Sequence, residues 1–480
     1  MNNNKLRNIL FWLFVIFICA LGAYLRLNLL FYPHSIHVDE ARVALNIIDR
    51  SYLGLFKPID FEQVAPPLFL VICKFFYTFI KFNYTSFFSD ILLRFFPCIS
   101  GILVIPAFGY LLQKLFKNKL LTIIGMFLIA INPAAISFSA KLKQYSTEML
   151  VSVIILITFI KIHPGKTHLK NSLYFLLLGF MNFLSMTALF FYPGGIAYLL
   201  MKHKQKTKQL VLCTIPLIIL IILNICFILS VYNVHYNIMS GFWEANFIAK
   251  PYNFIKTMLN ELFRINFYIV LIPFILGTLL LLKKNLKDFL LIASPIPVIY
   301  LLSIINYYPA EERLLLFILP CVLILCLYSI KILFLTRRNY YIVFMLFVIL
   351  FINYMIHIPQ FKYASIHRAT STGLQMFEYL KNDFKNDGII LSDKLNLYTC
   401  KYYERYYEKQ NINVTEFNIE KLKSGIYYLV IPSYALKRAD IVQIDNFLKS
   451  DGKINFIEII PFIVPTYTGL HRGLYVKFSL

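Results

Sequence analysis

The chain has 480 residues, 59% of them hydrophobic, and a mean hydropathy of +0.68. A soluble domain contains roughly 45–50% apolar residues, so this composition excludes a soluble protein and indicates an integral membrane protein surrounded by membrane lipids. The formal net charge of +23 does not call for a nucleic acid, because membrane proteins concentrate Lys and Arg in cytoplasmic loops and near anionic headgroups. We therefore expect no nucleic-acid partner.

Long apolar segments follow one another along the first three quarters of the chain, at 9–31, 66–82, 91–112, 120–139, 147–162, 171–187, 188–201, 209–231, 264–282, 288–306, 313–335 and 340–357. If segment 66–82 also crosses the membrane, strict alternation places the later Lys and Arg clusters outside, against the positive-inside rule. We therefore expect 66–82 to lie in the outer interface. This leaves a polytopic α-helical protein with about eleven spanning helices. The clusters concerned are Lys114/Lys117/Lys119, Lys166/Lys170, Lys202/Lys204/Lys206/Lys208, Lys283/Lys284/Lys287 and Arg337/Arg338.

The sidedness of the loops follows from this count. Lys5 and Arg7 precede the first segment, which we expect to be a retained anchor with a cytoplasmic N-terminus. An odd number of spans leaves the C-terminus outside, together with the loops 32–90, 140–146, 232–263 and 307–312. A composition rich in Lys, Asn and Ile, with no readable disulfide framework, fits the inner membrane of a bacterium.

The composition changes at about residue 360, which divides the chain into a membrane domain, 1–359, and an extracytoplasmic domain, 360–480. Strand-like runs at 388–391, 426–431, 454–459 and 474–478 alternate with helix-patterned stretches near 372–384, 397–410 and 438–450. This alternation predicts a small α/β domain with a partly parallel sheet. No glycine-rich phosphate loop follows any of these strands, so nothing supports nucleotide binding there.

The first outer loop carries two adjacent carboxylates, Asp39 and Glu40, between His37 and Arg42. Acids are scarce, at 24 Asp plus Glu against 47 Lys plus Arg, which makes this pair the first candidate for catalysis. A carboxylate screened from bulk water at the membrane surface can serve as a general base. The alternative is a structural role, with Asp39 as the N-cap of a helix over 40–50.

The second outer loop has Lys141 and Lys143 on the side where the positive-inside rule disfavours lysine, followed by Tyr145 and Glu148. A phosphate group near the membrane surface would account for both lysines, and so would lipid headgroups. Glu148 is a candidate second acid of the site. Its place at the start of a span equally suits a helix N-terminus.

The third outer loop ends in Glu311-Glu312-Arg313, before a span that contains Pro320. Arg313 could hold a phosphate or pair with either glutamate. The histidines form no recognisable metal set, and a divalent cation between Asp39 and Glu148 is left open.

These segments together resemble the C-type (GT-C) glycosyltransferases. The segments that carry the resemblance are the retained first span, Asp39-Glu40-Ala41-Arg42, Pro66-Pro67-Leu68, and the 307–313 segment before a proline-bearing span. Within that superfamily the chain is most similar to the bacterial transferases related to protein O-mannosyltransferases and to the lipid A aminoarabinose transferase. The resemblance covers residues 1–335 loosely, and an outer C-terminal α/β domain is common in the group.

The resemblance implies a cell-envelope enzyme that takes a sugar from a polyprenyl-phosphate donor and moves it, with inversion, to a hydroxyl of a lipid, glycan or protein. By analogy Asp39 takes the acceptor proton, and Glu40 and Glu148 orient the sugar or a metal ion. The donor phosphate is held by Lys141, Lys143 and Arg313, with Tyr145 matching the group by position and type. Ala65 departs from the Lys or His that relatives often carry before Pro-Pro.

Three other functions fit parts of the pattern. A ligase or polymerase would use a lipid-linked oligosaccharide in place of a monosaccharide donor. A transporter of lipid-linked glycans would also need outer basic residues, but the spans show no inverted repeat and no acids in mid-membrane. A non-catalytic assembly partner would act through its C-terminal domain.

Overall fold

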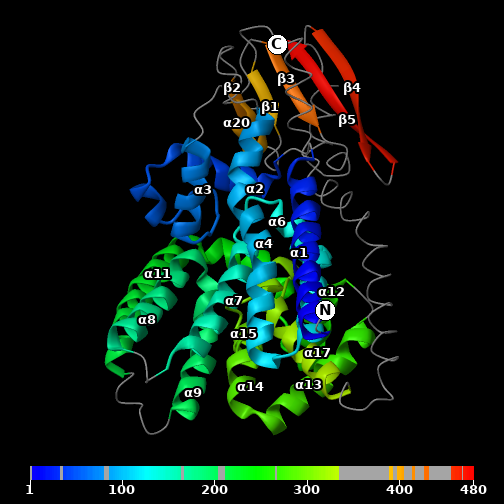
Figure 1. The fold of residues 1–480 in the computed structure, drawn as a ribbon. Helices are drawn as coiled ribbons and strands as arrows, with labels where there is room; N and C mark the ends of the chain where they lie inside the picture. Colours follow the sequence, from blue (N-terminus) through cyan, green and yellow to red (C-terminus); the bar gives the residue numbers. More distant parts are fainter. Residues whose placement is uncertain are drawn as a thin grey trace. The chain divides into compact units, whose positions relative to one another are not determined.

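The computed structural model describes residues 3–32, 36–79, 86–163, 167–203, 211–264, 267–333, 389–392, 397–404, 413–416, 426–431, 456–466 and 469–479 (Figure 1). The chain divides into two compact units, each described here by itself. The helical unit comprises Met1–Phe31, Arg50–Phe76 and Arg94–Ile358, and the mixed unit comprises Tyr32–Asp49, Tyr77–Leu93 and Pro359–Leu480.

The described residues up to 333 form α-helices and short 3-10 turns, and Figure 1 shows these helices in blue to yellow-green. The α-helices are α1 (Asn3–Leu30), α2 (Val38–Asp49), α3 (Pro67–Phe79), α4 (Ser86–Phe116), α5 (Lys119–Ile131), α6 (Pro133–Ser139), α7 (Tyr145–Lys161), α8 (His168–Leu184), α9 (Tyr192–Lys202), α11 (Ile215–Trp243), α12 (Pro251–Phe263), α13 (Phe267–Lys284), α14 (Leu286–Ala293), α15 (Pro295–Ile304), α16 (Glu312–Leu315) and α17 (Leu319–Leu333). Short 3-10 turns are η1 (Leu53–Phe56), η2 (Met186–Phe191), η4 (Leu212–Thr214), η5 (Glu244–Asn246) and η6 (Leu316–Ile318).

Five helical stretches among the described residues are long and apolar enough to cross a membrane: Lys5–Leu30, Phe88–Phe116, Leu212–His235, Phe267–Lys284 and Glu312–Lys331. The bent pairs α5–α6 and α14–α15, with bends of 52° and 47°, raise the number to seven if each pair is one span. The expected segments 147–162 and 171–187 form α7 and α8, which have 17 residues each. Segment 340–357 lies outside the described residues.

Segment 66–82 forms the short apolar helix α3, which has 13 residues. At 1.5 Å per residue such a helix is about 20 Å long, too short for a hydrocarbon core of about 30 Å. Pro66 comes directly before α3, and Pro67 is its first residue. A proline at these positions costs no helical hydrogen bond. Residues 80–82 lie outside the described residues, so the expectation that this segment does not span stays a prediction.

The break between α5 and α6 is stabilised by a buried arginine of α1. Pro133 has no N–H group, so it cannot donate to the carbonyl of Ile129 four residues earlier. The Arg26 guanidinium donates to that carbonyl at 3.1 Å and to the carbonyl of Ala130 at 2.8 Å, while Asn132 caps α6 through the N–H of Ala135. Arg26 is 0% exposed, so these bonds satisfy a buried charge and the end of α5 together.

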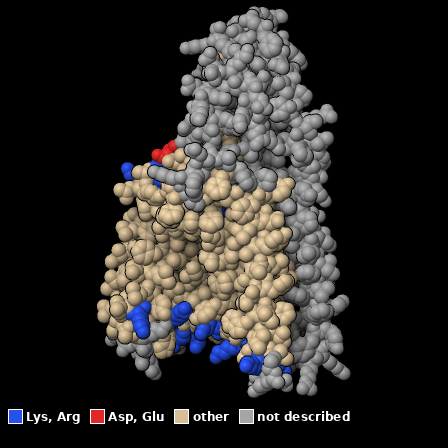
Figure 2. All heavy atoms as spheres, turned by 45° about the horizontal axis from the view of Figure 1, so that its top comes forward, with Lys and Arg blue, Asp and Glu red and all other residues tan. Residues whose placement is uncertain are grey.

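Lysines gather at one end of the helical unit, and Figure 2 shows them in blue beside a wide surface without charged side chains. Lys114 and Lys161 both lie over the ring of Tyr110, at 5.4 and 5.1 Å from its centroid. Asp288 interacts electrostatically with Lys202, Lys287 and Lys331. Lysines from five of the expected inside segments or their flanks thus share one end of the bundle. Of the predicted clusters, Lys166, Lys204–Lys208 and Arg337/Arg338 lie outside the described residues.

The mixed unit contains a five-stranded sheet of order β2-β1-β3-β5-β4 and a helix, α20 (Leu397–Glu404). Strand β1 (Ile389–Ser392) pairs in parallel with β2 (Asn413–Glu416) and β3 (Ile426–Ile431). Strand β5 (Gly469–Ser479) runs antiparallel to both β3 and β4 (Phe456–Thr466). The four expected strand-like runs overlap β1, β3, β4 and β5, whereas β2 was not expected. The expected helix 397–410 overlaps α20, and the stretches 372–384 and 438–450 lie outside the described residues.

The compact units differ from the expected division at 359–360 in one respect. Two pieces of the first outer loop, Tyr32–Asp49 and Tyr77–Leu93, group with the C-terminal residues. The physical reason is that α20 packs against α2 and its tyrosines bond to Asp90. The acid pair therefore belongs to the unit that contains the sheet.

Candidate functional site

Helix α2 begins one residue before the acid pair, and its first turn is closed by a capping box. The N–H of Asp39 donates to Nδ1 of His37 at 3.3 Å, and the N–H of His37 donates to Oε2 of Glu40 at 3.1 Å. Two backbone N–H groups at the start of a helix are satisfied reciprocally in this way. His37 and Glu40, which is 2% exposed, thus have a structural role in the helix start.

The cap identified in the structure corrects one alternative from the sequence. Asp39 is not the N-cap of a helix over 40–50, because the helix begins at Val38 and His37 occupies the cap position. Asp was the more obvious cap, since its side chain is a preferred acceptor for free N–H groups, whereas His is not. His37 and Glu40 form the cap, so capping of α2 does not explain why a carboxylate stands at position 39.

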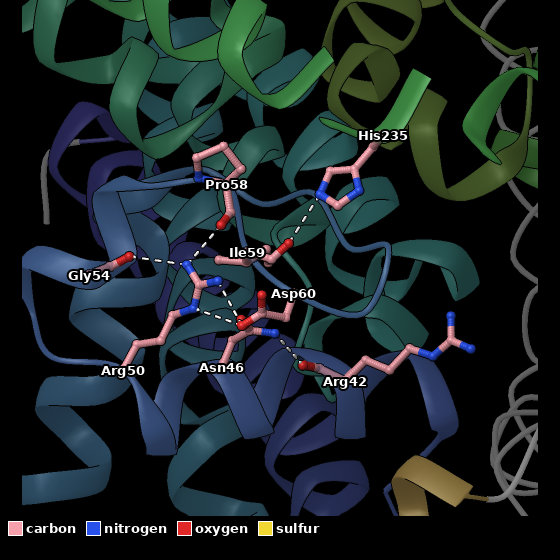
Figure 3. Close-up of polar contacts among 8 residues, drawn as sticks. All are labelled: Arg42, Asn46, Arg50, Gly54, Pro58, Ile59, Asp60 and His235. Atoms are coloured by element: carbon pink, nitrogen blue, oxygen red, sulfur yellow. Dashed lines mark hydrogen bonds and ion pairs between the residues drawn. The ribbon is translucent and has the colours of Figure 1, made fainter. Parts of the chain in front are cut away.

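Arg42 follows Asp39 by three residues, so the two side chains emerge on neighbouring positions of one helix face. The guanidinium of Arg42 lies over the ring of Tyr398 in α20, 4.6 Å from its centroid. One turn further, the Asn46 amide donates to the backbone carbonyl of Arg42 at 2.8 Å (Figure 3). The C-terminal part of the chain thus supplies an aromatic surface for this arginine.

In the helical unit, Arg50 organises the loop that leads to Pro66-Pro67 (Figure 3). Its guanidinium pairs with Asp60 at 2.7 Å and donates to the carbonyls of Pro58 at 2.8 Å and Gly54 at 3.3 Å. His235 of α11 lies with Nε2 3.0 Å from the carbonyl oxygen of Ile59. These contacts fix a loop that contains little regular structure.

The same loop then turns sharply and directs Gln63 to the second outer loop. Phe61 and Glu62 have φ values of 64° and 59°, a left-handed conformation that is uncommon for residues other than glycine. Beyond this turn the Gln63 Oε1 atom accepts a hydrogen bond of 2.5 Å from Nζ of Lys143. Both side chains are 8% exposed. The strained turn therefore contributes to the position of a buried ammonium group.

The two lysines of the second loop have different surroundings. Lys143 is buried against Gln63, whereas Lys141 is half-buried and lies over the ring of Phe138, 5.1 Å from its centroid. Tyr145 packs edge-on against the same ring, with 5.4 Å between centroids. Two of the candidate phosphate-binding residues, Lys141 and Tyr145, therefore share one aromatic neighbour.

The first turn of α7 places several polar side chains in the interior. Thr147 donates to the hydroxyl of Ser100 at 3.1 Å, and Glu148 is only 4% exposed. Tyr308 from the third outer loop is close enough to interact electrostatically with both Glu148 and Tyr145. Burial raises the pKa of Tyr308, and its two neighbours Glu148 and Tyr145 raise it further. The hydroxyl therefore stays protonated and donates to the carbonyl of Leu314 at 2.8 Å. The second and third loops thus meet at Glu148.

The third loop contains two ion pairs of unequal burial. Arg313 bonds to Glu311 at 3.3 Å, with 22% and 31% of the two side chains exposed. Glu312 is 7% exposed and receives both arms of the Arg264 guanidinium, with Nε to Oε1 at 2.6 Å and a second contact through Nη2. Arg264 is the left-handed cap residue of α12. Arg313 therefore pairs with a neighbouring glutamate, Glu311, which was one of the alternatives that the sequence left open. The pairing of Glu312 with Arg264 was not expected from the sequence.

The described residues contain no group of three or more His, Cys, Asp or Glu side chains that could hold a metal ion. A divalent cation between Asp39 and Glu148 stays an open prediction.

Sequence reasoning singled out the acid pair and the basic loops but missed five polar side chains that contact the loops or helix α20. Gln63, Asp60, His235, Asp90 and Arg264 carry no local motif. Their partners are 80, 10, 176, 312 and 48 residues away in the chain, and only the fold brings them together. The one available signal was the scarcity of acids, which applied to Asp60 and Asp90 as much as to Asp39.

Comparison with known proteins gives similarity in structure only. No family model matches the chain, and a search of curated proteins finds no match. Among solved structures, ArnT from Cupriavidus metallidurans in the apo state is 10% identical, with 98% of each chain covered and a TM-score of 0.57. ArnT bound to undecaprenyl phosphate is 9% identical, covers 99% of this chain and 98% of its own, and has a TM-score of 0.61.

The oligosaccharyltransferase of Archaeoglobus fulgidus, in complex with Zn and sulfate, is also similar. It is 13% identical, with 95% of this chain and 72% of that chain covered, and the TM-score is 0.54. The likeness to these structures runs over nearly the full chain and shows a shared fold. The resemblance expected from the sequence is confirmed at the level of the fold.

Proposed function

We propose that the chain is a membrane glycosyltransferase that moves a sugar from a polyprenyl-phosphate donor to an acceptor hydroxyl, with inversion at the anomeric carbon. The observation that carries this proposal is the fold shared over nearly the full chain with ArnT, one of whose structures holds undecaprenyl phosphate. Buried or organised cations in the outer loops, chiefly Lys143, support it from the chain's own residues.

In the proposed reaction Asp39 removes the proton from the acceptor hydroxyl as that oxygen forms a bond to the anomeric carbon. The bond between this carbon and the phosphate oxygen breaks, and the polyprenyl phosphate leaves with the electron pair. A positioned base contributes about 10²–10⁴-fold, because a sugar hydroxyl is a poor nucleophile. Lys143, with smaller contributions from Lys141 and Arg313, neutralises charge on the leaving phosphate. Glu40 acts through the cap of α2, and Glu148 orients the sugar.

The proposal includes the membrane arrangement expected from the sequence: about eleven spans, a cytoplasmic N-terminus, and outer loops that carry the site in a bacterial inner membrane. It also keeps the extracytoplasmic domain at 360–480. The lysines shared at one end of the helical unit support this orientation, because that end would face the cytoplasm.

Labelling of single cysteines tests the sidedness. Leu53 is 82% exposed in η1 of the first outer loop, and Lys284 is exposed at the lysine-rich end. In a variant without native cysteines, we expect Leu53→Cys to react with a membrane-impermeant maleimide in intact spheroplasts and Lys284→Cys to react only after lysis. The reverse pattern would show the opposite orientation.

The two lysines of the second loop are expected to differ in their effect on donor binding. Lys143→Met removes a buried ammonium group, and a charge-assisted contact to phosphate is worth about 1.5–3 kcal/mol, or about 10- to 150-fold in the KM for the donor. Lys141→Met is the matched control, with an expected change of at most about threefold, because this half-buried side chain lies on an aromatic ring. Steady-state kinetics at varied donor concentration measures both, and equal effects would contradict the assignment of Lys143.

The proposed function is tested with the purified full-length protein in lipid nanodiscs. Radiolabelled sugars on polyprenyl phosphate are supplied with a membrane extract as the source of acceptors, and labelled product is quantified. Transfer from at least one donor, absent in a boiled control, supports the proposal. Failure with every monosaccharide donor in a protein that is folded would overturn it.

The oligosaccharyltransferase neighbour favours one second candidate, a ligase or polymerase that transfers a lipid-linked oligosaccharide. The same assay separates the two functions, because a ligase would use only the lipid-linked oligosaccharide pool and would ignore monosaccharide donors.

A further inference from the structure

Helix α20, far along the chain from the acid pair, packs against α2 and against strand β2 within the mixed unit. Its residues Tyr402 and Tyr403 are both 0% exposed. Their rings pack edge-on with 5.0 Å between centroids, so the two hydroxyl groups are fixed relative to one another. A buried tyrosine hydroxyl usually requires a hydrogen-bond partner, and both have one at the start of α4.

That partner is the carboxylate of Asp90, which is 1% exposed. Its Oδ1 accepts from Tyr402 at 2.5 Å and its Oδ2 accepts from Tyr403 at 3.0 Å. A buried carboxylate is tolerated only when hydrogen bonds replace its lost hydration. The two tyrosines therefore join α20 to the first turns of α4.

Tyr403 makes one further hydrogen bond, to the segment before α2. Its hydroxyl oxygen accepts a hydrogen bond of 2.7 Å from the N–H of Ile36, which is 0% exposed. Ile36 directly precedes His37, the cap residue of α2. The hydroxyl thus accepts from the backbone and donates to Asp90, an arrangement in which each bond strengthens the other.

A continuous chain of contacts therefore runs from α20 to the acid pair. It passes from Tyr403 to Ile36, and from there through the His37–Glu40 capping box to Asp39. A second contact from α20 is the ring of Tyr398 under the guanidinium of Arg42. Both contacts reach the same helix, one before its first turn and one at its fifth residue.

We infer that α20 is the positioning element for the Asp39-bearing start of α2, with Tyr403 and Tyr398 as positioning residues. The inference rests on the proposed function for its catalytic consequence. It assigns the C-terminal part of the chain a role in the rate of transfer in addition to any role in acceptor binding. The placement of a base within about 1 Å can change a rate by about 100-fold, so a small shift of α2 matters.

The test compares Tyr403→Phe with Tyr402→Phe in the full-length protein. Each variant removes one hydroxyl from the same helix and one hydrogen bond to Asp90, but only Tyr403→Phe removes the bond to the Ile36 amide. We expect Tyr403→Phe to lower kcat by about 10- to 100-fold with the KM for the donor unchanged. Tyr402→Phe is expected to stay within about threefold of wild type because it removes the hydroxyl bonded to Asp90 Oδ1 and keeps the bond from the Ile36 amide to Tyr403.

Amide hydrogen exchange of the peptide that contains residues 36–40 gives a readout independent of turnover. Faster exchange there in Tyr403→Phe, and not in Tyr402→Phe, is the expected result. Equal exchange in both variants would overturn the inference, and so would faster exchange in Tyr403→Phe with an unchanged kcat. If wild type transfers no sugar from any donor, the proposed function fails, while the exchange comparison still decides whether α20 holds this segment.

A second pair of variants serves if Tyr403→Phe does not fold. Tyr398→Leu removes the aromatic face under Arg42, whereas Tyr398→Phe keeps it. We expect kcat to fall by about tenfold for the leucine variant and to remain at the wild-type value for the phenylalanine variant. Identical rates for the two variants would overturn the role of Tyr398.

Discussion

Asp39→Asn is expected to lower kcat by about 10²–10⁴-fold while the protein still folds and inserts. The amide keeps the size of the side chain but cannot take a proton from the acceptor hydroxyl. The start of α2 does not depend on this carboxylate, because His37 and Glu40 form the capping box. Kinetics with a labelled donor measures the loss, and wild-type turnover by the variant would move the base to another residue.

The neighbouring carboxylate provides the matched control. In Glu40→Gln the side-chain amide oxygen still accepts from the N–H of His37, so the cap is preserved and only the charge is lost. We expect the kcat of Glu40→Gln to stay within about threefold of wild type and its free energy of unfolding to change by less than about 1 kcal/mol. A loss as large as that of Asp39→Asn would show that Glu40 takes part in the chemistry.

Glu312→Ala is expected to destabilise the folded protein by about 3 kcal/mol, because it removes the carboxylate that receives both arms of the Arg264 guanidinium in a largely enclosed position. The side chains are 28% and 7% exposed for Arg264 and Glu312, which places the effect at the lower end for buried ion pairs. Equilibrium unfolding in mixed micelles measures the difference.

The preceding residue is its control. Glu311→Ala breaks the pair with Arg313, in which the carboxylate side chain is 31% exposed against 7% for Glu312, and pairs with a solvent-exposed partner contribute about 0–1 kcal/mol. Equal destabilisation by the two variants would mean that burial does not separate the two pairs. Because Arg264 ends α12 in a left-handed conformation, we also expect Glu312→Ala to loosen the connection after that helix.

The apolar helices could be predicted from the sequence because their signal is local. Segment 66–82 differed from the other apolar segments only through the charges of later loops. Its residues Pro67–Phe79 form a helix of 13 residues. The bends in α5–α6 and α14–α15 fall at Pro133 and Pro295. Both prolines are visible in the sequence, but whether a proline bends a helix depends on which groups bond to the carbonyls that it leaves without an N–H partner. The strand-like runs overlap four of the five strands, since alternation of side chains is also local.

The site could be predicted only in part. Lys141 and Lys143 look alike in the sequence, and only the fold shows that one meets Gln63 and the other an aromatic ring. The capping role of His37 was not predictable, because Asp39 is the better cap by residue type. Tyr403 and Ile36 are separated by 367 residues and carry no shared motif, so their hydrogen bond could not be inferred before the fold was known.

The bond from Arg26 to the end of α5 has a consequence for how the chain enters the membrane. Helix α1 is synthesised and inserted before α5 exists, so at that moment the guanidinium lacks the carbonyls of Ile129 and Ala130. An arginine in mid-membrane costs about 2.5–3.5 kcal/mol on insertion, but Arg26 is only four residues from the end of α1 and can extend to the nearer headgroups. The bonds from Arg26 to these carbonyls can form only once α5 has been synthesised, so they join the two helices after the first of them has entered the membrane.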